Sequence, residues 1–128
     1  MKADVDKLLE IYEKHKFIIV GLDFDNTIYP LSEDPTIAKR CEEVRKLIAL
    51  VRPKIQLCLW TVADDWSLKY KITIAEEVYG LEFDAINQSV LYNENDQIRK
   101  PYFNLLLDDN AGLDDAIKTL RIFNTKTK

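Results

Sequence analysis

Residues 17–27 read FIIVGLDFDNT and decide the fold. The first six are apolar, with three β-branched residues in a row and no alternation with polar ones. Such a run is typical of a parallel strand that is buried on both faces of a sheet. It stops abruptly at Asp23, and Asp25 follows two residues later. This strand is therefore expected to deliver acidic side chains to one edge of a sheet.

Two further apolar runs also end in polar side chains. Residues 55–60 lead to Thr61, and residues 103–107 lead to the pair Asp108 and Asp109. In parallel α/β sheets, ligands bind beyond the carboxyl ends of the strands, where the strand order reverses. We therefore expect these strand ends to share one site.

Helical periodicity alternates with the predicted strands. The spacing of apolar residues predicts helices over residues 4–15, 36–51, about 64–79 and 113–123, with a short extra strand over 83–86. Residues 87–99 are predicted to form a loop. The alternation implies right-handed crossovers and a parallel sheet with helices on both faces. The fold class is thus predicted to be α/β, with a three-layer, Rossmann-like architecture.

The length of 128 residues fits one compact domain over residues 1–128. Only residues 28–53 separate the first predicted strand from the second, and one helix takes up most of them. No cap domain over the strand ends is therefore expected. With an open site, the protein would accept a large or terminal group, or would borrow a lid from a second copy of the chain.

Charge and composition exclude several other classes of protein. The net charge of -4 offers no basic surface for general nucleic-acid binding. No apolar run approaches the roughly 18 residues of a membrane span, so membrane association is not expected. Cys41 and Cys58 lack CxxC spacing and are interpreted as reduced core thiols. A cytoplasmic location is expected by default.

The acidic strand ends suggest a metal site. Carboxylates at the edge of a buried sheet are costly unless they are hydrogen-bonded or bind a cation. Mg²⁺ prefers oxygen ligands and is often held by one or two carboxylates, a substrate phosphate and waters, and Asp23 with Asp108 fits that count. The single histidine, His15, lies near the end of the first predicted helix, so a zinc site is not predicted.

The order of these pieces resembles the haloacid dehalogenase superfamily of phosphohydrolases. In that superfamily, an apolar strand followed by Asp-x-Asp-x-Thr precedes a strand ending in Thr or Ser, a Lys, and a strand ending in an acidic pair. The matching residues here are Asp23 with Asp25, Thr61, Lys100, and the pair that follows residue 107. The resemblance extends over residues 17–123 and implies the small type that lacks a cap.

The resemblance implies a phosphatase that hydrolyses phosphomonoesters of small molecules or of macromolecular phosphate ends. Asp23 would be the nucleophile and would form an aspartyl-phosphate, and Asp25 would be the general acid and base. Thr61 would bind phosphoryl oxygens, while Lys100 would place a positive charge against the phosphate and the nucleophile.

The same resemblance implies that the cofactor is Mg²⁺. Its ligand set would comprise Asp23, Asp25, Asp108 and Asp109. Asp108 would bind the metal directly, and Asp109 would act directly or through a metal-bound water.

Several alternatives stay open at this stage. Thr61 and Asp109 could each cap a following helix, and Lys54 competes with Lys100. A phosphotransferase would form the same phosphoenzyme but would use another acceptor. A phospho-accepting receiver module has a similar length and similar residue types, but its acidic pair comes on the first strand, whereas here Asp108 and Asp109 come last. Motif order therefore disfavours the receiver.

Overall fold

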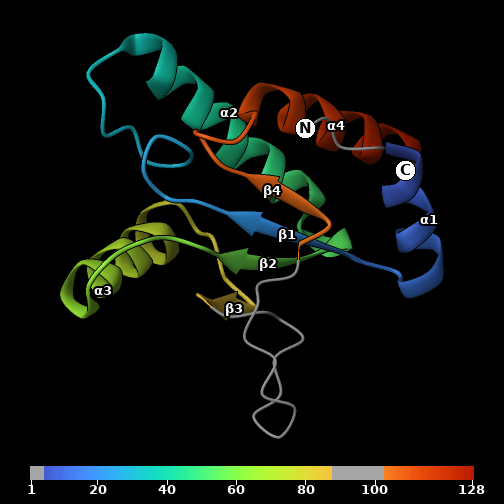
Figure 1. The fold of residues 1–128 in the computed structure, drawn as a ribbon, viewed down its shortest axis with the longest axis horizontal. Coiled ribbons are helices and arrows are strands. Elements are labelled where there is room, and N and C mark those ends of the chain that lie inside the picture. The colour runs from blue at the N-terminus through green and yellow to red at the C-terminus, as the bar shows by residue number, and fades with distance from the viewer. Residues whose placement is uncertain (1–4, 88–102) are drawn as a thin grey trace, which may run out of the picture.

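The computed structural model describes residues 5–87 and 103–128 (Figure 1). Its elements, in chain order, are α1 (Val5–His15), β1 (Ile18–Leu22), α2 (Pro35–Val51), η1 (Arg52–Lys54), β2 (Ile55–Leu59), α3 (Asp65–Thr73), η2 (Ile74–Val78), β3 (Ala85–Ile86), β4 (Leu105–Leu107) and α4 (Leu113–Lys126). Every strand and helix predicted from the sequence is present near its predicted place. Apart from Asn87, the loop predicted over residues 87–99 lies outside the described residues.

The strands form one parallel sheet in the order β3-β2-β1-β4. The chain moves outward from β1 to β3 and then returns to place β4 on the other side of β1, so the strand order reverses between β1 and β4. The predicted fold class is confirmed: the sheet is flanked by helices and is compatible with a three-layer, Rossmann-like architecture. Within residues 5–87 and 103–128, no inserted segment forms a cap domain. The single domain over 1–128 stays a prediction.

Local signals explain where the helices begin and end. The side chain of Asp34 accepts a hydrogen bond from Thr36 N at 2.9 Å and caps α2. Asp64 caps α3 in the same way by accepting from Ser67 N at 2.8 Å. The predicted helix does continue past α3, but as the π-helical segment η2, and Gly80 with a φ of +69° follows it.

The helices α1 and α2 each pack against α4, whereas α3 lies apart from them at the carboxyl end of β2 (Figure 1). Alternate residues of β1, which are Ile18, Val20 and Leu22, belong to the main hydrophobic core. Gly21 points to the opposite face of the sheet, where a Cβ atom would lie only 2.7 Å from Cγ of Phe103. The close approach of this ring requires glycine at position 21.

We expect Gly21→Ala to destabilise the protein by about 1–3 kcal/mol, because the added methyl group forces the ring of Phe103 and the strand apart. Urea unfolding of both proteins measures the difference in the free energy of unfolding. Leu50→Ala is a matched control, since Leu50 is 66% exposed and should change little. Equal stability of Gly21→Ala and wild type would show that Phe103 moves aside at no cost.

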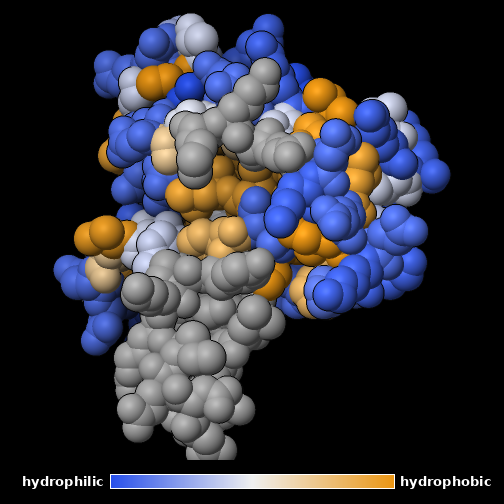
Figure 2. Space-filling view, turned by 45° about the vertical axis from the view of Figure 1, so that its right-hand side comes forward, coloured by the Kyte–Doolittle hydropathy of each residue, from blue (hydrophilic) through white to orange (hydrophobic). Residues whose placement is uncertain are grey.

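The side of the molecule seen in Figure 2 is largely hydrophilic, with hydrophobic residues exposed between the hydrophilic ones. In the described part of the chain, no helix combines the length and the apolar character needed to cross a membrane. Cys41 and Cys58 are buried and are not joined by a disulfide, as predicted.

Candidate active site

Three of the predicted residues follow neighbouring strands at the same edge of the sheet. Asp23 directly follows β1 and its backbone N–H donates to Leu107 O at 2.9 Å, at the end of β4. On the other side of β1, Trp60 N donates to Leu22 O at 2.8 Å. The structure thus brings Asp23 and Asp108 together where the strand order reverses, with Thr61 on the neighbouring strand end.

Asp23 lies in a crowded acidic environment. Burial raises the pKa of its carboxyl, and the negative charges of Asp108 and Asp25 raise this pKa further. A hydrogen bond from the backbone N–H of Phe24 and the charge of Lys71 act in the opposite direction. The negative charges of two neighbouring carboxyl groups therefore act on Asp23 at this edge, and a bound cation would offset that repulsion.

The segment after β1 folds back on itself through its backbone. Asn26 adopts a left-handed conformation with a φ of 59°, and its side-chain Oδ1 accepts from Leu31 N and Ser32 N, both at 3.0 Å. Ile28 N and Tyr29 N both donate to Phe24 O at 3.1 Å. These contacts hold the turn that carries Asp25, whose side chain is 41% exposed.

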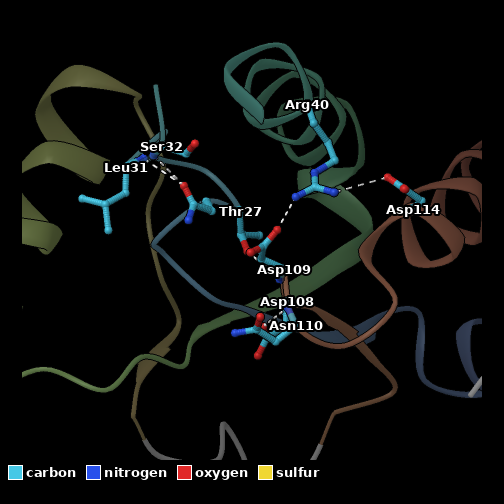
Figure 3. Close-up of polar contacts among 9 residues, drawn as sticks. Thr27, Leu31, Ser32, Arg40, Asp108, Asp109, Asn110 and Asp114 are labelled. Atoms are coloured by element: carbon cyan, nitrogen blue, oxygen red, sulfur yellow. Dashed lines mark hydrogen bonds and ion pairs between the residues drawn. The ribbon is translucent and has the colours of Figure 1, made fainter. Parts of the chain in front are cut away.

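Asp108 and Asp109 have different surroundings. Arg40 reaches from α2 between Asp109 and Asp114 and forms an ion pair with each, while Asp108 points away from it (Figure 3). Asp109 N donates to Oγ1 of the buried Thr27 at 3.0 Å. Asp109 does not cap α4, because the residue at that position is Gly112. The carboxylate of Asp109 is thus paired with Arg40, whereas the negative charge of Asp108 raises the pKa of Asp23.

We expect Arg40→Met to destabilise the protein by about 1–3 kcal/mol, because it leaves the carboxylate of Asp109, which is only 25% exposed, without its cation. Arg121→Met is the matched control, since Arg121 pairs with Glu43 at an exposed position and such pairs contribute little. Urea unfolding compares the two variants. Equal losses for both would show that the contact between Arg40 and Asp109 has no special weight.

A lysine that the sequence analysis did not single out lies at this edge. Lys71 Nζ donates to Asp25 Oδ2 at 3.1 Å and to Thr61 Oγ1 at 3.3 Å. The alternative that Thr61 caps α3 is wrong, because Asp64 does so. A lone lysine inside a predicted helix has no distinctive pattern.

The predicted phosphate-binding lysine, Lys100, lies outside the described residues. Its rival Lys54 precedes β2, at the amino end of the strand, and donates to Asn124 Oδ1 at 3.3 Å and Thr127 Oγ1 at 2.9 Å. The structure therefore separates Lys54 from the strand ends that carry Asp23 and Thr61.

The predicted Mg²⁺ site stays a prediction, and the side chains at the sheet edge are of the chemical kind that this ion binds. Among the described residues, no three His, Cys, Asp or Glu side chains form a ready-made metal-binding group. The sheet edge offers the pair Asp23 and Asp108. Burial is the main cause of the raised pKa of Asp23, and the negative charge of Asp108 raises this pKa further. Two carboxylates are what Mg²⁺ takes from a protein when waters and a substrate phosphate complete its shell.

Comparison with known proteins supports the fold and names no activity. No family model matches the chain, and no curated protein matches it significantly. The chain is similar to the solved structure of a conserved protein from Bacteroides thetaiotaomicron, with a TM-score of 0.62 and 29% sequence identity. The match covers 88% of this chain and 93% of that one.

Proposed function

We propose that the chain is a Mg²⁺-dependent phosphohydrolase of the haloacid dehalogenase type, which cleaves phosphomonoesters through an aspartyl-phosphate on Asp23. The observation that carries this proposal is the placement of Asp23. Its partly buried carboxyl lies where the strand order reverses, beside the charges of Asp108 and Asp25 and within the influence of Lys71. A carboxyl group with a raised pKa among other titratable side chains at a sheet edge is typical of a catalytic site.

The chain's own side chains account for each step of the reaction. A carboxylate oxygen of Asp23 attacks phosphorus as the bond to the leaving oxygen breaks, and Asp25, which has to be protonated when the substrate binds, donates its proton to that oxygen. Water then attacks the phosphorus of the aspartyl-phosphate, Asp25 takes its proton, and inorganic phosphate leaves with Asp23 restored. Mg²⁺ held by Asp23 and Asp108 would supply the positive charge that reduces repulsion between nucleophile and phosphate.

Hydrolysis is favoured over transfer to another acceptor by the exposure of Asp25. Its side chain is 41% exposed, so water can reach the group that would activate it. The same openness fits a phosphate carried by a small molecule or by the end of a macromolecule, or a lid supplied by a second copy of the chain. The two unbridged thiols, Cys41 and Cys58, support a cytoplasmic location.

The test is release of inorganic phosphate from a broad panel of phosphomonoesters, with Mg²⁺ and with EDTA. We expect multiple turnovers with Mg²⁺ and a loss of turnover with EDTA that is reversed by added Mg²⁺. A phosphorylated product without free phosphate would indicate a phosphotransferase. One slow turnover per chain would favour the receiver-like switch instead.

A further inference from the structure

We propose that Lys71 is a phosphate-binding residue, whose ammonium group receives a phosphoryl oxygen of the substrate beside Thr61. This proposal rests on the proposed phosphohydrolase function. It differs from what the family resemblance implies, because the resemblance places the phosphate-binding lysine before β4, at Lys100, whereas Lys71 comes from the helix after β2.

The surroundings of Lys71 point toward the site. Its side chain is only 13% exposed, although lysines are mostly exposed in proteins. Its Nζ atom lies 3.1 Å from Asp25 Oδ2, 3.3 Å from Thr61 Oγ1 and 5.5 Å from the centre of the Phe24 ring. Two of these neighbours, Asp25 and Thr61, were placed at the site by their sequence positions, so the charge of Lys71 is directed at the predicted reaction centre.

Other cations near this edge are engaged elsewhere. Arg40 binds Asp109 and Asp114. Arg45 donates to Ile28 O at 2.6 Å and lies 4.3 Å from the centre of the Tyr79 ring. Among the residues that the structure describes, Lys71 is thus the cation that faces both Asp25 and Thr61.

The chemistry of an ammonium group suits this role. It carries three N–H donors on a flexible four-carbon stem, so Lys71 can keep its contact with Thr61 and turn another donor toward a phosphoryl oxygen. A phosphate carries more negative charge than the carboxylate of Asp25, so it attracts the ammonium group of Lys71 more strongly. The hydrogen bond between them would be charge-assisted, and such bonds are about twice as strong as neutral ones. Thr61 and Lys71 would then form one phosphate subsite within the segment that runs from β2 to α3.

The experiment measures the dissociation constant of inorganic phosphate in the presence of Mg²⁺ by calorimetry, which requires no turnover. We expect Lys71→Met to weaken phosphate binding by roughly 10-fold to 100-fold, which is the loss of one charge-assisted hydrogen bond. Lys71→Arg should restore part of the affinity because it restores the charge. Lys69→Met, at an exposed position on the same helix, should bind phosphate as wild type does. Thermal unfolding verifies that each variant is folded.

If Lys71→Met does not fold, Lys71→Gln replaces it, since glutamine keeps a hydrogen bond to Thr61 within reach and removes the charge. An unchanged phosphate affinity in the folded, uncharged variant would overturn the proposal and leave Lys71 as the ion-pair partner of Asp25. Absence of phosphate binding by the wild type would also overturn it. Phosphate binding that depends on Lys71 in a protein without turnover would uphold this inference while the proposed hydrolysis fails.

Discussion

Asp23→Asn is expected to abolish phosphate release, with a fall in kcat of more than about 10⁴-fold, because the amide cannot attack phosphorus and no neighbouring group replaces it. Asparagine has the shape of aspartate, so the variant keeps the backbone hydrogen bond from residue 23 to Leu107 O. Initial rates with the best substrate of the panel, at saturating Mg²⁺, measure the loss. The wild type should also incorporate labelled phosphate into the chain, and the variant should not.

Stability provides the control for this variant. Burial raises the pKa of Asp23, which means that the folded protein disfavours the charged form there. Replacing the carboxylate by a neutral amide should therefore leave the free energy of unfolding unchanged or slightly higher, so lost activity cannot be attributed to unfolding. Asp115→Asn, at an exposed position of α4, should retain full activity. Turnover that survives in Asp23→Asn would assign the nucleophile to another residue.

The sequence predicts well where these acidic residues lie, because each is tied to the end of a strand. A buried parallel strand needs an apolar run, and the first polar residue after it has to lie at the sheet edge. Asp23 and Asp108 are therefore predictable as neighbours once β1 and β4 are recognised. The register of the strands, in which Leu22 pairs with both Leu59 and Leu107, then brings the ends together.

Residues that reach the site from helices were not predictable in the same way. Arg40 meets Asp109 from α2, across 69 positions of sequence, and Lys71 reaches Asp25 across 46. Which helical side chain faces a strand end depends on how the helix packs, and local periodicity does not determine that. Which of the two residues Asp108 and Asp109 forms an ion pair with Arg40 likewise depends on how α2 packs. Lys100 stays a prediction.

Asp25→Asn is expected to slow turnover by roughly 10²-fold to 10⁴-fold, which is the usual contribution of general acid and base catalysis. The asparagine side chain keeps an oxygen that can accept from Lys71, so the ion pair becomes a hydrogen bond from the charged ammonium group to a neutral amide and the fold should persist. What the variant loses is the ability to give a proton to the leaving oxygen and to take one from water. Initial rates against wild type and against Asp65→Asn, an exposed position at the start of α3, measure that loss.

The choice of leaving group separates the two roles of Asp25. An aryl phosphate such as 4-nitrophenyl phosphate releases a weakly basic oxygen that needs little protonation, whereas an alkyl phosphate releases a strongly basic one. If Asp25 is the general acid, phosphoenzyme formation in Asp25→Asn should fall far more with the alkyl ester than with the aryl ester. Breakdown of the phosphoenzyme should be slow with both, because water then lacks its base. An equal and less than tenfold loss with both esters would assign proton transfer to another group.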